Sequence, residues 1–258
     1  MQRSAVWALG AGALLCAFVL SSIHPAAPAP VIRVEINAGW RLTARIVGPN
    51  ARELMAPVDL SRRLDRLDAV ADALRDAPVL PLEIAAHEDV IWRWVVRLLE
   101  HAERVGIPDA TLVGAGGRRV RVPLPVVPWP QAFAETTFQV QISGMPGFAT
   151  TVGFDHALSA EEREHGVSQR AGWIGRFERA DPTSRPRTLD ALDAELDRER
   201  VRAQSDGRSY RLGFVVAQGP VTINRPQRGV WFAPYRDAFD VLLAMRRARG
   251  DALVLVRH

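Results

Sequence analysis

The sequence predicts an α+β protein: one N-terminal transmembrane helix followed by two small two-layer α/β-sandwich modules. Three observations predict this fold. A long uncharged segment opens the chain, and several short runs alternate apolar and polar residues, as half-buried strands do. In addition, Pro81–Val113 and Tyr210–Val256 each carry an apolar strand, a polar turn, an amphipathic helix ending at a glycine, and a closing apolar strand. A repeated order of this kind indicates a duplicated module.

The composition is that of a folded globular protein and excludes several classes of function. Hydrophobic residues make up 48% of the 258 residues and charged residues 24%, both ordinary values. The 33 basic residues are all arginine, and the 29 acidic residues leave a net charge of only +4. No basic run or aromatic–basic stripe indicates nucleic-acid binding. The single cysteine, Cys16, excludes an intramolecular disulfide and a C-x-x-C motif.

The first element, residues 1–24, is predicted to be a membrane anchor. Ala5–Ile23 carries no charge, and its roughly 19 residues are enough to span a bilayer as a helix. This is longer than the apolar core of a signal peptide, about 7–15 residues. A cleaved signal peptide is the alternative, because small residues such as Ala26 and Ala27 follow the span. Arg3 places the N-terminus in the cytoplasm. We therefore expect a single-pass protein of the bacterial inner membrane with its bulk in the periplasm.

The first module is predicted to occupy residues 31–117. It opens with a β-hairpin, because apolar and polar residues alternate on both sides of the turn at Asn37–Gly39. Glycine commonly ends helices, so Gly106 is the expected end of the last helix. The remaining elements are a helix with an apolar stripe from Leu60 to Leu74, a strand at Leu80–Ile84, a helix with an apolar stripe from Ile91 to Val105, and a strand at Ala110–Val113.

A Pro-rich linker at residues 118–131 is predicted to separate this module from a second one at 132–258, so that each would fold by itself. The charged stretch 155–187 is expected to be an inserted loop. The other elements of the second module are strands at Phe138–Ile142 and Phe148–Phe154, a helix around Leu189–Leu196, a strand at Tyr210–Val216, a helix at Tyr235–Arg249 that stops at Gly250, and a strand at Leu253–Val256.

The stretch LEIAAHEDVIWRWVVRLLEHAERVGIPDATLV resembles the ExbD/TolR family of biopolymer-transport proteins. The shared pattern is an apolar strand, an acid-containing turn, an aromatic residue, a helix with paired valines, an A-x-x-x-G-I helix end and a final strand. The resemblance covers the anchor and the first module, and the second module matches in pattern. The matching elements fall on Leu82–Ala86, Glu88 and Asp89, Trp92, Val95 and Val96, Ala102–Ile107, and Ala110–Val113.

The resemblance implies a bitopic envelope protein in a biopolymer transport or energy-transduction complex. Its partner would be a multi-span inner-membrane motor protein of the ExbB/TolQ type, with peptidoglycan or an envelope protein as a further partner, and the protein would be a homo-oligomer. The membrane helix of the family carries an aspartate, whereas Ala5–Ile23 has no ionisable side chain. Because an intramembrane carboxylate is costly and is placed for function, the resemblance implies partner or cell-wall binding without the proton-carrying residue.

The residues offer no catalytic site, so we expect no enzyme, no cofactor and no metal centre. No G-x-S-x-G motif and no complete phosphate-binding glycine motif occurs. His87 and His101 lack ligand spacing, and the acidic and histidine-containing stretch Asp155–His165 is interpreted as a solvated loop. One alternative is a secreted or periplasmic metal-dependent enzyme that uses this stretch. Another is a structural envelope module without a transport role.

The expected site is a surface that contacts a partner. Trp92 and Trp94 lie two residues apart on a predicted helix and therefore face different sides. An exposed tryptophan at this position would be a favourable partner contact. Arg62, Arg63 and Arg66 form a basic helical face. A solvated face is one interpretation, and contact with a partner, anionic lipid or cell-wall polymer is the other.

Overall fold

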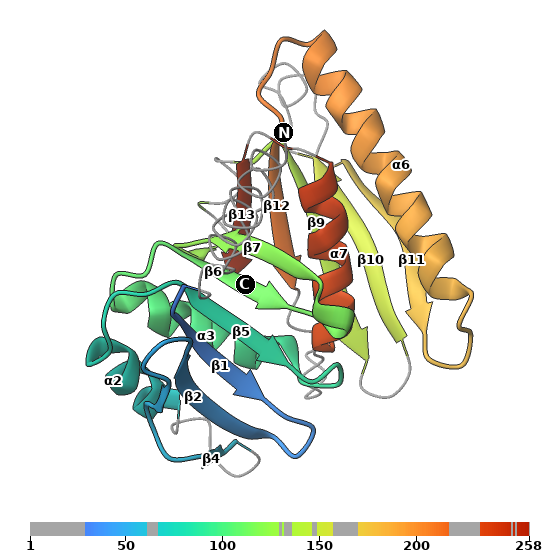
Figure 1. Cartoon of the computed structure of the whole chain (residues 1–258). Coiled ribbons are helices and arrows are strands. Elements are labelled where there is room, and N and C mark those ends of the chain that lie inside the picture. Colours follow the sequence, from blue (N-terminus) through green and yellow to red (C-terminus); the bar gives the residue numbers. More distant parts are fainter. Residues whose placement is uncertain are drawn as a thin grey trace, which may run out of the picture.

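The computed structural model describes residues 29–60, 67–128, 131, 136–145, 149–156, 170–216, 233–248, 250 and 252–257. Over these residues the chain is a mixed α/β protein with two sheets and four α-helices (Figure 1). The expected membrane anchor, residues 1–24, lies outside the described residues. Among the helices of the described part, none is both long and apolar enough to cross a membrane.

The first sheet contains seven of the described strands and is built on the hairpin β1–β2. Its order is β3-β2-β1-β5-β6-β7, and β4 also pairs with β2. β5 runs parallel to β1, with Ile84 beside Val34, and β6 runs parallel to β5. The elements are β1 Val31–Ile36, β2 Arg41–Val47, β3 Arg52–Glu53, β4 Val58–Asp59, α2 Asp68–Arg75, β5 Leu82–Ala86, α3 Trp92–Arg104, β6 Asp109–Val113, the short 3-10 helix Ala115–Gly117, and β7 Arg119–Pro123.

The second sheet contains six of the described strands and is built on the hairpin β9–β10. Its order is β11-β10-β9-β12-β13-β8. β12 runs parallel to β9, with Phe214 beside Val140, and β13 runs parallel to β12. Figure 1 shows the long helix α6, in orange, along the outer side of this sheet next to β11. The elements are β8 Val127–Pro128, β9 Phe138–Met145, β10 Ala149–His156, β11 Arg170–Glu178, α6 Ser184–Ser205, β12 Arg211–Val216, α7 Tyr235–Arg247, and β13 Ala252–Arg257.

Four strands at the centre of each sheet share the same order and directions. These are β2-β1-β5-β6 in the first sheet and β10-β9-β12-β13 in the second. In each case an antiparallel hairpin is followed by two strands parallel to its first strand. A helix precedes each of these two strands, and the second helix, α3 or α7, has 13 residues in both halves. The two halves of the described chain therefore have one topology, as the repeated sequence order predicted.

The burial of side chains in the strands and helices follows the apolar periodicity of the sequence. Ile32, Val34 and Ile36 are buried along β1, and the residues between them are only half-buried. In α3 the side chains of Val95 and Leu98 are buried, as the apolar stripe predicted. The helix ends where Gly106 adopts a positive φ of 84°, a backbone conformation that glycine enters without steric cost.

Two segments form strands where the sequence suggested a linker and a loop. The expected linker, 118–131, contains β7, which pairs with β6, and β8, which pairs with β13. Val120 and Val122 are buried there while Arg119 and Arg121 are exposed. This segment therefore forms a strand with alternating burial, although its prolines are typical of a linker. The expected loop, 155–187, contains the end of β10, all of β11 and the start of α6.

The two halves meet where α3 and α7 begin, and each helix caps the other. Neither helix has a side-chain cap at its N-terminus. Instead, the Trp92 amide donates to the Ala233 carbonyl at 2.9 Å, and the Tyr235 amide donates to the Val90 carbonyl at 2.6 Å. Ile91 and Pro234 form an antiparallel bridge between these bonds. Because corresponding residues of the two halves exchange equivalent bonds, the contact has the geometry of a two-fold interface.

Apolar packing follows the same pseudo-symmetry, so the two sheets share a continuous hydrophobic core. The rings of Trp92 and Tyr235 stack at 6.1 Å. Trp92 also meets Phe214 of β12 edge-on at 5.8 Å. In the opposite direction, the Tyr235 hydroxyl donates to the Val113 carbonyl of β6 at 3.0 Å. Each half therefore completes the core of the other, whereas the sequence analysis expected two cores.

We predict that Trp92→Ala destabilises both sheets together, by about 3–5 kcal/mol. The indole is 2% exposed and fills the junction between the halves, so its removal leaves a cavity shared by both. Hydrogen exchange should then rise in β5 and β6 and in β12 and β13 to the same extent. Val79→Ala, at a position 96% exposed, is the matched control. Exchange that rises in the first sheet alone would contradict a shared core.

Candidate functional site

The tryptophans expected as partner contacts are both inside the protein. Trp92 lies in the junction described above, and Trp94 is 9% exposed. Trp94 packs edge-on against Trp40, with the ring centroids 6.3 Å apart. The structure therefore gives both side chains a packing role. Arg62, Arg63 and Arg66, the expected basic face, lie outside the described residues.

Trp173 of β11, by contrast, is strongly exposed, at 68%. β11 is the outermost described strand of its sheet. Its pairing with β10 shifts register beside this residue: Gly175 lies opposite Val152 and Trp173 opposite Gly153, so Ile174 is an extra residue. A β-bulge on an edge strand changes the direction of neighbouring side chains. The sequence analysis missed Trp173 because it fell in the expected loop.

A shallow groove of about 390 Å³ runs beside Trp173 between β11 and the first turns of α6. Its volume is at the lower end of the range of small-molecule sites, about 300–1,000 Å³. Arg176 and Arg187 line the groove and are largely exposed. Each also has an acidic neighbour, since Arg176 lies 3.8 Å from Glu178 and Arg187 lies 3.1 Å from Asp181. An aromatic ring beside two guanidinium groups suits a flat or extended ligand with acidic groups.

A network of buried charges joins α7 to α6 and to the first half. Asp237 and Asp240 lie in the first two turns of α7 and are 2% and 7% exposed. Arg185 of α6 pairs with both carboxylates, at 2.7 Å from Asp240. Arg118, which precedes β7, lies 2.9 Å from the other oxygen of Asp240. Because removing one member would leave a buried charge unpaired, this network is structural in character.

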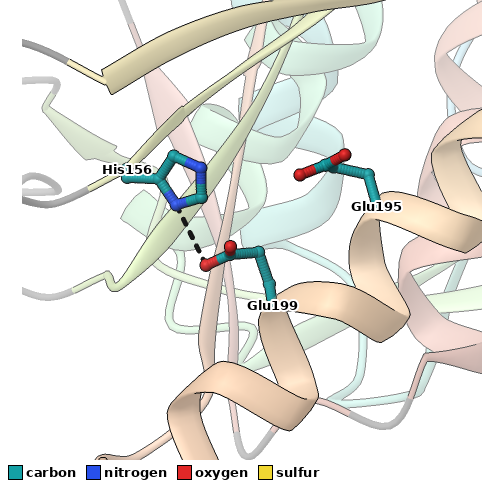
Figure 2. Close-up of side chains that lie close together, drawn as sticks. All are labelled: His156, Glu195 and Glu199. Carbon is teal, nitrogen blue, oxygen red and sulfur yellow. Dashed lines mark ion pairs between the residues drawn. The ribbon is translucent and has the colours of Figure 1, made fainter.

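A second polar cluster lies between the end of β10 and the middle of α6. Figure 2 shows the carboxylates of Glu195 and Glu199 turned toward the imidazole of His156. His156 Nδ1 lies 2.9 Å from Glu199 Oε2. One donor atom from each of the three residues lies within 4.8 Å of the other two. A nitrogen donor and two carboxylates are a set that divalent metal ions accept.

The surroundings of this cluster are largely apolar on the inner side. The rings of Phe138 and Phe154 meet the imidazole of His156 edge-on at 5.1 and 5.0 Å. On the outer side, Arg198 pairs with Glu195, and Arg202 lies 2.9 Å from Glu199 Oε1. The spacing of Glu195 and Glu199 is visible in the sequence. Their approach to His156 is not, because it depends on how α6 packs.

The other histidines weighed as metal ligands do not join this cluster. His87 is exposed at the end of β5, and its Nδ1 accepts a bond from the Asp89 amide. His101 is buried on α3, where Nε2 lies 3.7 Å from Asp68 Oδ1. Burial, helped by the nearby charge of Arg104, lowers the pKa of His101. Glu161, Glu162, Glu164 and His165 of the acidic stretch lie outside the described residues.

Comparison of the chain with protein-family models gave no match, and comparison with curated proteins found no significant relative. The family resemblance of the first half therefore rests on the sequence pattern alone.

We predict that His101 makes the protein less stable as the pH falls below about 6.5, the ordinary pKa of histidine. A histidine with a lowered pKa in the folded state takes up its proton only on unfolding. As the pH falls, the free energy of unfolding therefore decreases by up to about 1.4 kcal/mol per pH unit for that proton. His101→Gln should flatten this dependence between pH 7.5 and 5.5 in thermal unfolding, and Val79→Ala, at an exposed position without a titratable group, is the control. An unaltered slope in His101→Gln would contradict the assignment.

Proposed function

We propose that this chain is a bitopic envelope protein built from two tandem ExbD/TolR-like modules, each a two-layer α/β sandwich. It would act by binding a partner or the cell wall within a biopolymer transport or energy-transduction complex, without a proton-carrying residue of its own. Ala5–Ile23 would hold it in the bacterial inner membrane with the modules in the periplasm. The partner is a multi-span inner-membrane motor protein of the ExbB/TolQ type.

The observation that carries this proposal is the topology found in both halves. The resemblance consists of a hairpin, a helix, a strand, a helix ending at glycine and a closing strand. That order is formed by β1–β2, α2, β5, α3 and β6, and again by β9–β10, α6, β12, α7 and β13. The reciprocal capping of α3 and α7 further supports a fused pair of equivalent modules, and the proposal extends to association of whole chains into a homo-oligomer.

The binding surface we propose is the groove beside Trp173. The N-terminal ends of α3 and α7 are used in the contact between the halves, so these ends are not free for a partner. β11 offers an exposed tryptophan, a register shift and Arg176, and α6 adds Arg187 on the other side of the groove. Tryptophan and arginine are the residue types that contribute most to binding at protein interfaces. The hydroxyls of Thr188 and Ser184 on α6 already bond the main-chain groups of Arg176 and Glu178, so a partner would bind through the side chains of the groove.

We predict that the full-length protein copurifies with a multi-span motor protein from detergent-solubilised membranes, and that Trp173→Ala lowers its recovery at least tenfold. A hot-spot tryptophan contributes about 2 kcal/mol or more, which corresponds to such a factor. Val201→Ala is the matched control, because Val201 is also an exposed apolar residue, 58% exposed, on α6 outside the groove.

Three outcomes separate the alternatives. Recovery of the motor protein with wild type and Val201→Ala but not with Trp173→Ala supports both the function and the surface. Equal recovery with all three proteins keeps the function and rejects Trp173 as its contact. If no motor protein is recovered, the transport complex is rejected. Binding to sedimented peptidoglycan would then support cell-wall binding, and binding to neither target would leave a purely structural role.

A further inference from the structure

Glu199 occupies a position on α6 where the helix period calls for an apolar residue. Leu192, Leu196 and Ala203 are buried along one stripe of the helix, and Glu199 falls between them at 6% exposure. A buried carboxylate is costly unless it is paired and hydrogen-bonded. The inward side of α6 thus carries a charge where packing alone would place a methyl group. This position requires a specific partner on the adjoining sheet.

His156 is that partner, and Glu195 adds a second carboxylate one turn earlier on α6. Residues four apart lie on the same helix face, and two like charges there repel each other unless a cation lies between them. The side chains of His156 and Glu195 are 10% and 13% exposed. Three polar side chains from a strand and a helix therefore converge in a nearly dry space, and no backbone rearrangement is needed to bring them together.

We propose that His156, Glu195 and Glu199 bind a divalent transition-metal ion of the zinc class, and that this ion fastens β10 to α6. One imidazole nitrogen and two carboxylate oxygens are ligands that Zn²⁺ accepts, and a water molecule would complete the tetrahedron. Ligands about 2.0–2.2 Å from a tetrahedral ion lie about 3.4 Å from one another. The observed separations, up to 4.8 Å, require the donor atoms to approach one another by up to about 1.4 Å when the ion binds.

A metal ion at this site would have to displace the arginine side chains that pair with the two glutamates. Arg198 and Arg202 each pair with the glutamate three residues earlier. Their side chains are 67% and 42% exposed, so both guanidinium groups can move into water when a metal ion takes the carboxylates. Without the ion, the arginines neutralise the glutamates. The same carboxylates thus serve either a salt-bridge cluster or a metal site, and competition between arginine and metal is measurable.

The test is Zn²⁺ binding by the chelator-treated full-length protein, measured by titration calorimetry and by thermal unfolding. We expect one high-affinity Zn²⁺ per chain in the wild type and a rise in the unfolding temperature with Zn²⁺ concentration. Glu195→Gln keeps the shape of the side chain and should weaken binding at least tenfold, as should His156→Ala. His87→Ala, which removes an exposed histidine elsewhere, should bind like the wild type.

Arg198→Ala keeps the proposal testable where a ligand variant fails to fold. It leaves all three donors in place and removes a competing cation, so its affinity for Zn²⁺ should rise severalfold. The proposal is overturned if the wild type and Arg198→Ala bind no Zn²⁺, or if Glu195→Gln and His156→Ala bind it as tightly as the wild type.

Discussion

The reciprocal capping of α3 and α7 is the contact on which the rest of the structure depends. An isolated half would leave the amides of Trp92 and Tyr235 at uncapped helix ends, beside a large aromatic surface. A buried amide without a partner costs about 1–3 kcal/mol, so these bonds are worth most when the rings exclude water around them. The carbonyls of Val90 and Ala233 supply the missing acceptors. The halves are therefore joined at the point where each is least complete.

The buried charges follow from this contact. α7 begins at the junction, so Asp237 and Asp240 lie in its first turns, where carboxylates favour the positive end of the helix dipole. Burial makes them dependent on Arg185 from α6 and on Arg118 from the first half. Gly114 allows α7 to pack closely against the first half, because a Cβ at this position would lie 2.4 Å from the ring of Phe239. Ion pairs thus add to the buried apolar stripe of Leu192, Leu196 and Ala203 in holding α6 against the shared core.

Local periodicity predicted most elements of this fold but not the contacts between them. The alternation in β1 and the stripe through Val95 and Leu98 depend on neighbouring residues, so the sequence displays them directly. β7 and β11 were missed because proline, glycine and charge resemble loops. In β7 every second residue is nevertheless buried, and in β11 the residues Gly175 and Phe177 are buried. The burial of Trp92 was missed for another reason: helical periodicity shows which face is buried, but not that a helix end meets another helix. The approach of His156 to Glu199 is likewise a tertiary contact.

The two halves are alike where they meet and different where they do not. α3 and α7 both have 13 residues, and each presents one capped end and one aromatic ring to the other half. α6 has 22 residues where its counterpart α2 has 8, and the nine-residue β11 stands beside β10 where the first sheet has only the two-residue strands β3 and β4. The contact between the halves does not require this enlargement. The groove at Trp173 and the cluster at His156 both involve the enlarged elements. Both proposed sites therefore lie in the part of the second half that does not follow the internal symmetry.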